Sequence, residues 1–207
     1  QKNPGVEIIL TAKDIPGINR FGVIPNYDDQ PALAYKKAKF KGEAIAIIAG
    51  KPETMKDLVL SDFPINWEPS NDTMDITDAL NVNNPNIHDD KSDGNILVIG
   101  KVKTGNVNTV ANKTFEIEGE LETSYVEHAY IEPEAGSSWI EDNILVIHAC
   151  TQAPYMDRDD TAKILGLEKN KVRIIPSSTG GGFGSKLDVS LQPLLGLVTL
   201  KTKKPCR

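Results

Sequence analysis

The apolar residues of this chain fall into short runs separated by turn-forming residues. Apolar runs at residues 6–10 and 43–49 each predict one strand, and a stretch rich in proline, glycine and asparagine lies between them. Pro52 followed by Glu53 predicts a helix that starts near Thr54, because proline fits a first helical turn and an acidic side chain suits the positive end of the helix dipole. This pattern predicts a small α/β unit.

The middle of the chain, from about residue 78 to residue 105, is rich in Asn, Asp, Gly and Pro. These residues favour turns and loops, so we expect a domain boundary in this region. The expected division is a first domain at residues 1–80, a linker at residues 81–110 and a second domain at residues 111–207.

The second half of the chain contains four further predicted strands. Apolar and acidic residues alternate at residues 114–122, which is typical of a half-buried strand. Shorter apolar runs predict strands at residues 138–140 and 144–148, and another at residues 172–176.

Two helices are predicted among these strands. The first follows Pro154 and runs to Leu167, with Gly166 near its end. The second runs to Leu200, and Asp188 can cap its N-terminus. Strands and helices together predict an α+β fold.

Composition limits the classes of protein and of partner. The formal net charge of -6 argues against binding nucleic acid through a basic face. No apolar run approaches the roughly 18 residues of a membrane span, and the first residues lack the apolar core of a secretory signal. The two cysteines offer neither a disulfide framework nor a four-ligand metal site, so we expect a reducing, cytoplasmic location.

The most informative segment is the run at residues 178–186, in which four of five consecutive positions are glycine. Glycine tolerates positive φ angles and exposes backbone N–H groups, so the run predicts a loop that lies close to a polar or anionic ligand. A glycine-rich turn that only allows tight packing remains an alternative.

Two common phosphate-binding motifs do not fit this run. A GxxxxGK[ST] loop requires glycine before the lysine and a hydroxyl after it, but Ser185 and Leu187 occupy those positions. A GxGxxG fingerprint fits Gly180 and Gly182 and fails at Ser185. A nucleotide-binding enzyme is therefore only a third hypothesis.

A second motif lies 31 positions before Phe183, where Gln152 follows a predicted strand. The segments TQAPY (151–155), VRIIPSS (172–178) and GGGFGSK (180–186) together resemble the molybdenum-binding subunit of the xanthine dehydrogenase and aldehyde oxidoreductase family of molybdenum hydroxylases. Residues 118–136 are similar to the family segment that precedes the TQ motif. The segments at residues 5–17 and 39–49 resemble the family's α/β hammerhead domain, which implies a hammerhead followed by the first part of a molybdopterin-binding domain.

The resemblance implies a molybdenum cofactor whose metal is held by the dithiolene of a pterin, so no metal ligand is expected from the protein. It implies that the cofactor is contacted by Gln152, Gly181, Gly182, Phe183 and Gly184. Phe183 and Leu187 would line the substrate pocket, although Phe183 alone could also fill a gap in the core. Purine-oxidising members carry glutamate where this chain has Leu187, so the implied substrate is an aldehyde or an N-heteroaromatic compound rather than xanthine.

The catalytic glutamate of the family lies far downstream in a longer subunit, so no catalytic residue is expected in this chain and we expect it to be inactive alone. The implied partners are the remaining molybdenum-binding domain or subunit, an iron–sulfur subunit, an FAD subunit and a small-molecule substrate. A cofactor-free assembly fragment is the alternative from another class. Lys186 is expected to be a surface or helix-entry charge, and Glu132 and Glu134 to be scaffold without a catalytic role.

Overall fold

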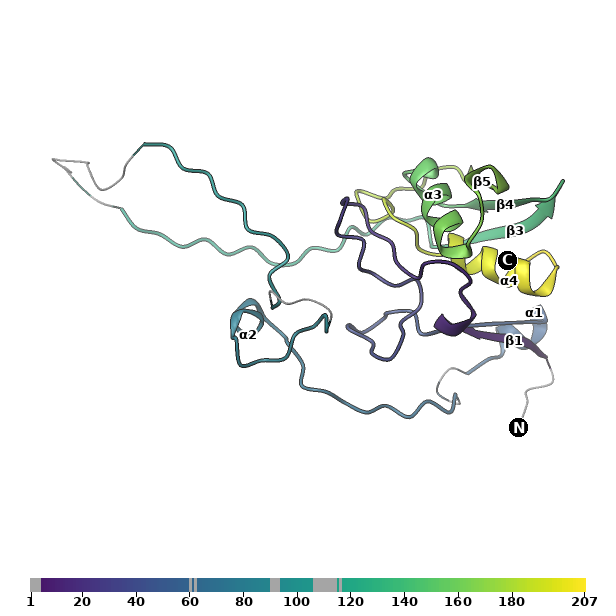
Figure 1. Cartoon of the computed structure of the whole chain (residues 1–207), viewed down its shortest axis with the longest axis horizontal. Helices are drawn as coiled ribbons and strands as arrows, with labels where there is room; N and C mark the ends of the chain where they lie inside the picture. The colour runs from purple at the N-terminus through teal and green to yellow at the C-terminus, as the bar shows by residue number, and fades with distance from the viewer. Residues whose placement is uncertain (1–4, 60, 62, 90–93, 106–114, 116) are drawn as a thin grey trace. The chain divides into compact units, whose positions relative to one another are not determined.

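The structure is a computed structural model that describes residues 5–59, 61, 63–89, 94–105, 115 and 117–207 (Figure 1). The chain divides into two compact units. One combines residues 1–61 with residues 126–207, and the other consists of residues 62–125. The candidate site lies in the first unit, whereas the domain division at residues 80 and 110 stays a prediction.

The first sheet confirms the two strands predicted near the N-terminus. Strand β1 (Val6–Thr11) pairs antiparallel with β2 (Ala46–Gly50). A short 3-10 helix, η1 (Ala12–Asp14), follows β1, and the short helix α1 (Pro52–Lys56) follows β2. Pro52 lies in the first turn of α1, as predicted from its position before Glu53.

The second sheet has the order β3-β4-β5. Strands β3 (Gly136–Glu141) and β4 (Ile144–Ala149) form an antiparallel hairpin, and its two turn residues, Asp142 and Asn143, both adopt positive φ angles. This turn type matches the right-handed twist of the strands. Strand β5 (Val172–Pro176) runs parallel to β4, so a crossover has to connect them.

Helix α3 (Pro154–Leu165) provides that crossover, followed by η4 (Lys169–Lys171). Proline in its first turn and Gly166 in the left-handed conformation at its end confirm the predicted helix signals. The second predicted helix is confirmed as α4 (Gln192–Thr202). The predicted cap is wrong, because α4 begins after Asp188 and has Pro193 in its first turn. Proline lacks the N–H that would otherwise need a partner there, so it is the local start signal.

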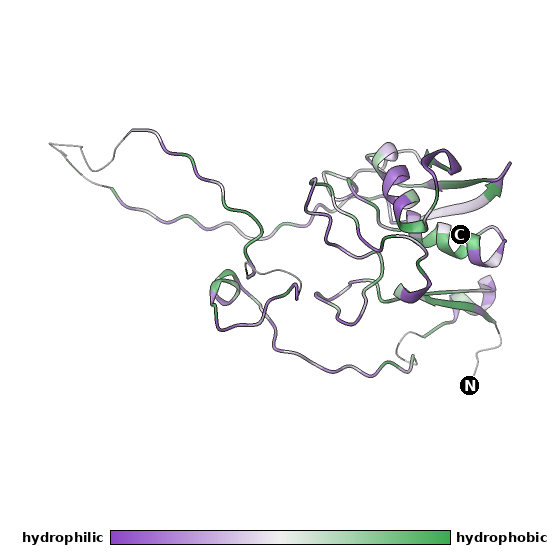
Figure 2. Cartoon of the chain, in the orientation of Figure 1, coloured by the Kyte–Doolittle hydropathy of each residue, from purple (hydrophilic) through white to green (hydrophobic). Residues whose placement is uncertain are grey.

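The core of the first unit surrounds β4, which is the central strand of its sheet. Leu145, Val146 and Ile147 are buried, and Figure 2 shows β4 and much of α4 as hydrophobic. Leu10 of β1 belongs to the same cluster as Leu145 and Leu197 of α4. The segments before and after the Asn-rich region therefore share one core.

The N-terminal segment also closes the end of α3. Gly17 and Ile18 donate their N–H groups to the carbonyl oxygens of Ile164 and Lys163, both at 3.0 Å. A helix leaves its last carbonyl groups without partners inside the helix, and a segment almost 150 positions away supplies donors to these two. The Lys163 carbonyl also accepts the N–H of Gly166 at 3.4 Å. Asp28 adds an ion pair with Lys163.

The second unit contains helix α2 (Ile76–Leu80), which Asp75 caps by accepting a hydrogen bond from the N–H of Asp78. The strand predicted at residues 114–122 is wrong for the part that is described: residues 115 and 117–122 form no strand, and their apolar side chains are exposed. Alternation specifies which side chains share a face, but a strand also requires a hydrogen-bonded neighbour. Thr114 and Glu116 lie outside the described residues.

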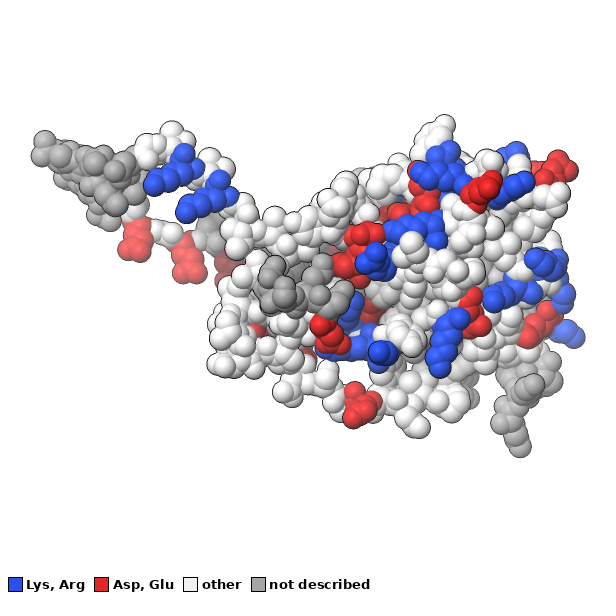
Figure 3. Space-filling model, in the orientation of Figure 1, with Lys and Arg blue, Asp and Glu red and all other residues white. Residues whose placement is uncertain are grey.

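On the face drawn in Figure 3, Lys and Arg side chains lie among Asp and Glu side chains. Within the described part of the chain, no helix has the length and apolar character needed to cross a bilayer.

Candidate functional site

Gln152 and the glycine-rich run meet at one edge of the second sheet. Gln152 follows β4 and the run follows β5, and parallel neighbouring strands end at the same edge. The side-chain oxygen Oε1 of Gln152 accepts hydrogen bonds from the N–H of Gly184 at 3.0 Å and of Lys186 at 3.2 Å. The backbone N–H of Gln152 donates to the carbonyl of Lys186 at 3.0 Å. The structure thus brings the two sequence motifs into direct contact.

These hydrogen bonds determine which end of the Gln152 amide faces outward. Both partners of Oε1 are N–H donors, so the oxygen must face the loop and the NH2 group must face away from it. Nε2 makes no hydrogen bond to any residue that the structure describes, and Gln152 is exposed. The sheet edge therefore presents an uncharged donor toward its surroundings.

Three glycines of the run make room for side chains of this same protein. A Cβ atom at Gly182 would lie 2.4 Å from Oε1 of Gln152, and one at Gly180 would lie 2.5 Å from Cβ of Glu132. At Gly181, where φ is 106°, a Cβ atom would lie 3.0 Å from Cβ of Tyr130. Tight packing against these side chains therefore accounts for glycine at 180–182, and contact of Gly181 and Gly182 with a cofactor stays a prediction.

Gly184 and Phe183 differ from these three glycines. Gly184 has a φ of 101°, and a Cβ atom there would meet nothing closer than Nε2 of His128 at 3.9 Å, so its outer side is open. Phe183 has a φ of 53° and is 73% exposed. The alternative that Phe183 fills a core gap is therefore excluded. Leu187 is also exposed, at 38%.

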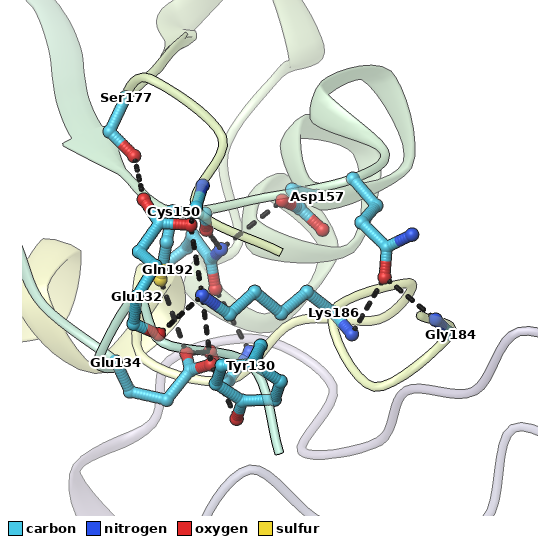
Figure 4. Close-up of polar contacts among 12 residues, drawn as sticks. Tyr130, Glu132, Glu134, Cys150, Asp157, Ser177, Gly184, Lys186 and Gln192 are labelled. Atoms are coloured by element: carbon cyan, nitrogen blue, oxygen red, sulfur yellow. Dashed lines mark hydrogen bonds and ion pairs between the residues drawn. The ribbon is translucent and has the colours of Figure 1, made fainter. Parts of the chain in front are cut away.

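Lys186 departs furthest from its sequence-based expectation, because it is 3% exposed rather than a surface charge. Its Nζ atom donates to Oε2 of Glu132 at 3.0 Å and to the backbone carbonyl of Glu132 at 2.9 Å. The ammonium also lies over the ring of Tyr130, 4.2 Å from its centroid. Figure 4 shows this side chain reaching into a cluster of polar groups.

Glu132 is the centre of that cluster. Its Oε1 atom accepts a hydrogen bond from Oγ of Ser177 at 2.6 Å, and its Oε2 atom accepts one from the N–H of Gly180 at 3.1 Å. The hydrogen bonds from Ser177, Lys186 and Gly180, in that order, lower the pKa of Glu132 to about 2. Its carboxylate therefore joins the start of the glycine run to its end.

Glu134 forms a neighbouring set of contacts. Its carboxylate accepts hydrogen bonds from the hydroxyl groups of Tyr130 and Ser190, at 3.0 and 2.5 Å, and from the thiol of Cys150 at 3.3 Å. Burial, together with the hydrogen bond to Glu134, raises the pKa of the Cys150 thiol. Glu134 thus links the segment before β3 to the end of β4.

Gln192 and Asp157 complete the polar groups beneath the loop. Nε2 of Gln192 donates to the carbonyl of Cys150 at 3.0 Å and to Oδ2 of Asp157 at 3.2 Å. Asp157 is 1% exposed, and burial raises its pKa to about 6. Its Oδ1 atom has no hydrogen-bond partner among the described residues.

The histidines do not converge. His148 is exposed on β4, and Nδ1 of His128 lies 3.9 Å from Glu127. Among the described residues, no group of three or more His, Cys, Asp and Glu side chains is arranged to hold a metal ion.

Comparison with known proteins identifies the family of this chain. The molybdopterin cofactor-binding domain family matches residues 87–207. The large molybdopterin subunit of nicotinate dehydrogenase from Eubacterium barkeri is 36% identical over 98% of this chain and 47% of its own length. A probable xanthine dehydrogenase component from Bacillus subtilis is 32% identical over the whole chain and 27% of its own length.

The fold is also that of solved structures. Aldehyde oxidoreductase from Desulfovibrio gigas has a TM-score of 0.81 and 23% identity, over 98% of this chain and 23% of that chain. Quinoline 2-oxidoreductase from Pseudomonas putida has a TM-score of 0.80 and 21% identity, over 99% of this chain and 27% of that chain. The chain thus spans about half or less of the length of the relatives that it matches. It belongs to the molybdopterin cofactor-binding domain family, in the xanthine dehydrogenase and aldehyde oxidoreductase group that its motifs indicated.

Proposed function

We propose that this chain forms part of the molybdenum-cofactor-binding subunit of a hydroxylase that oxidises aldehydes or N-heteroaromatic compounds with oxygen derived from water. The observation that carries the proposal is the outward-facing amide of Gln152, which Gly184 and Lys186 hold at the edge of the sheet. The match of residues 87–207 to the cofactor-binding family supports it.

The residues at this edge fit a molybdenum cofactor. Nε2 of Gln152 can donate a hydrogen bond to an oxygen on the metal without adding charge, which suits an anionic centre. Gly184 leaves open space beside it. The backbone of Gly181, Gly182 and Phe183 would line the pterin and oxo side of the cofactor. When bound, the cofactor supplies the oxygen that is transferred and accepts two electrons from the substrate.

Phe183 and Leu187 would define the substrate pocket of the hydroxylase. Phe183 is an exposed aromatic side chain on a turn with a fixed, left-handed backbone, so it can form a wall against a flat substrate. Leu187 offers no carboxylate to bind a purine. Because a relative at 36% identity belongs to a nicotinate dehydrogenase, nicotinate is the first substrate to test.

The wider architecture also belongs to the proposal. Residues 1–80 would form an α/β hammerhead domain, followed by a linker at residues 81–110 and by the N-terminal part of the molybdopterin-binding domain at residues 111–207. Electrons would pass to iron–sulfur and FAD modules on other domains or subunits. Both cysteines are free thiols, which supports a reducing compartment such as the cytoplasm.

The test uses the assembled enzyme that contains this chain. Molybdenum analysis and pterin fluorescence should show the cofactor, and Gln152→Ala should lower kcat by roughly a hundredfold, in line with the loss of a preorganised donor. Lys201→Ala, which changes an exposed lysine on α4, is the matched control. An assembled and active enzyme without molybdenum would favour the cofactor-free assembly role instead.

A further inference from the structure

We propose that Lys186 and Glu132 form a positioning pair that fixes the glycine-rich loop and, through it, the orientation of the Gln152 amide. The inference rests on the proposed function for its catalytic consequence. Its structural part concerns only residues of this chain.

Lys186 contacts both Gln152 and Glu132. Its backbone N–H donates to Oε1 of Gln152, and its backbone carbonyl accepts from the N–H of Gln152. Its side chain meanwhile donates twice to Glu132. Lys186 thus connects Glu132, through its side chain, to Gln152, through its backbone.

Glu132 is itself held by residues at the start of the loop. Ser177 and Gly180 both donate to its carboxylate, and the N–H of Glu132 donates to the carbonyl of Gly180 at 3.2 Å. Glu132 thus holds the start of the loop, just after β5. Lys186 holds the end of the loop, where its backbone N–H contacts Gln152. The loop is anchored at both ends to one residue.

The ion pair between Lys186 and Glu132 is buried, so each charge depends on the other for compensation. The side chains of Lys186 and Glu132 are 2% and 14% exposed. Removing one member of a buried ion pair leaves the other without compensation, which is far more disruptive than removing an exposed pair. The ion pair between Lys204 and Glu7, at 2.7 Å, joins two more exposed side chains and provides the matched control.

The experiment measures hydrogen exchange of backbone amides in the full chain. Lys186→Met should increase exchange at residues 180–186 by about tenfold or more, while amides of β4 and α3 keep their protection. Lys204→Met should leave the loop unchanged. Glu132→Gln should reproduce the effect of Lys186→Met, and the double variant should be no worse than either single variant, because paired residues are not additive.

Wild-type exchange at residues 180–186 in both single variants would overturn the proposal. If Lys186→Met also exposes the core amides, Glu132→Gln decides: selective exchange in the loop supports the pair, and any other pattern rejects it. In the molybdenum-loaded assembly, Lys186→Met should lower kcat by roughly tenfold or more with KM nearly unchanged, because a misplaced donor affects the reacting centre and not substrate binding. A wild-type assembly without molybdenum would contradict the proposed function and leave the exchange result standing.

Discussion

Gln152 and Lys186, 34 positions apart, exchange hydrogen bonds in both directions. The N–H of Lys186 donates to the Gln152 side chain at 3.2 Å, and the N–H of Gln152 donates to the Lys186 carbonyl at 3.0 Å. The side chain of Gln152 thus takes the place of a backbone acceptor in the loop. Its oxygen has a structural task, and its nitrogen remains available for chemistry.

Gln152→Glu separates these two tasks. A glutamate oxygen can still accept from Gly184 and Lys186, but the outward group loses its N–H donors and gains a negative charge. We expect the exchange protection of the loop to be retained and kcat to fall by roughly a hundredfold or more. Gln152→Ala should impair both, and a variant Gln152→Glu with wild-type kcat would show that the amide nitrogen has no role.

Gly182→Ala tests the packing of Gln152 against the loop. The added Cβ atom would lie 2.4 Å from Oε1 of Gln152, so that side chain must move. This movement breaks the two hydrogen bonds that Oε1 accepts, so we expect a loss of about 1–3 kcal/mol in the free energy of unfolding and a lower molybdenum content. Gly100→Ala is the control, since nothing lies within 4 Å of its Cβ position. Equal stability of the two variants would contradict the geometry.

Leu187→Glu tests the choice of substrate. Leu187 is 38% exposed, so the fold should tolerate a carboxylate there. We expect the ratio of kcat/KM for xanthine to kcat/KM for nicotinate to rise at least tenfold, because a new hydrogen-bonding partner favours the purine. An unchanged ratio would remove residue 187 from the substrate pocket.

The pKa of Glu132 predicts how the loop responds to acid. Because that pKa lies near 2 in the folded chain and 4.5 is its ordinary value, the carboxylate stabilises the fold above about pH 4.5, and this contribution is lost as the pH falls toward 2. The groups that face it are Lys186, Ser177 and Gly180. NMR titration of the Gly180 amide should therefore show a transition near pH 2 that Glu132→Gln abolishes. A transition near pH 4.5 would show that the carboxylate is not held.

The pKa of Asp157 predicts the opposite dependence on pH. Burial raises this pKa from 3.8 to about 6, so the folded chain binds a proton more tightly than the unfolded chain, and stability falls as the pH rises from about 4 to 6. The loss is at most about 3 kcal/mol. Urea unfolding at pH 4 and pH 7 measures it, and Asp157→Asn should flatten the difference. The same pH dependence in the wild-type chain and in Asp157→Asn would refute the shift.

Local signals in the sequence were sufficient for much of the fold. Pro154 and Gly166 mark both ends of α3 because each acts on its own backbone, and the apolar runs that became β3, β4 and β5 are short and bounded by turns. The prediction that Asp188 caps α4 was wrong because several residue types can start a helix, and only the tertiary structure selects among them. The alternation at residues 114–122 could not specify a partner strand.

The candidate site also combines features that local motifs predict with features that only long-range contacts determine. Gln152 and the glycine run could be found because both lie in short contiguous motifs. The contact between Lys186 and Glu132 was not predicted because it joins residues 54 positions apart, and nothing in the local pattern around Lys186 indicates burial. The one signal in the sequence was indirect: three adjacent glycines require neighbouring side chains to fill the space, and these proved to be Glu132, Tyr130 and Gln152.

The closure of α3 by Gly17 and Ile18 has a consequence for engineering and for gene evolution. The carbonyl groups of Lys163 and Ile164 each accept a hydrogen bond from the N-terminal segment, and Leu10 contributes to the same core as β4. A recombinant piece that starts after residue 125 would expose those carbonyl groups and part of that core. Exchange of cofactor-binding segments between related genes should therefore succeed only when residues 5–21 are transferred together with them.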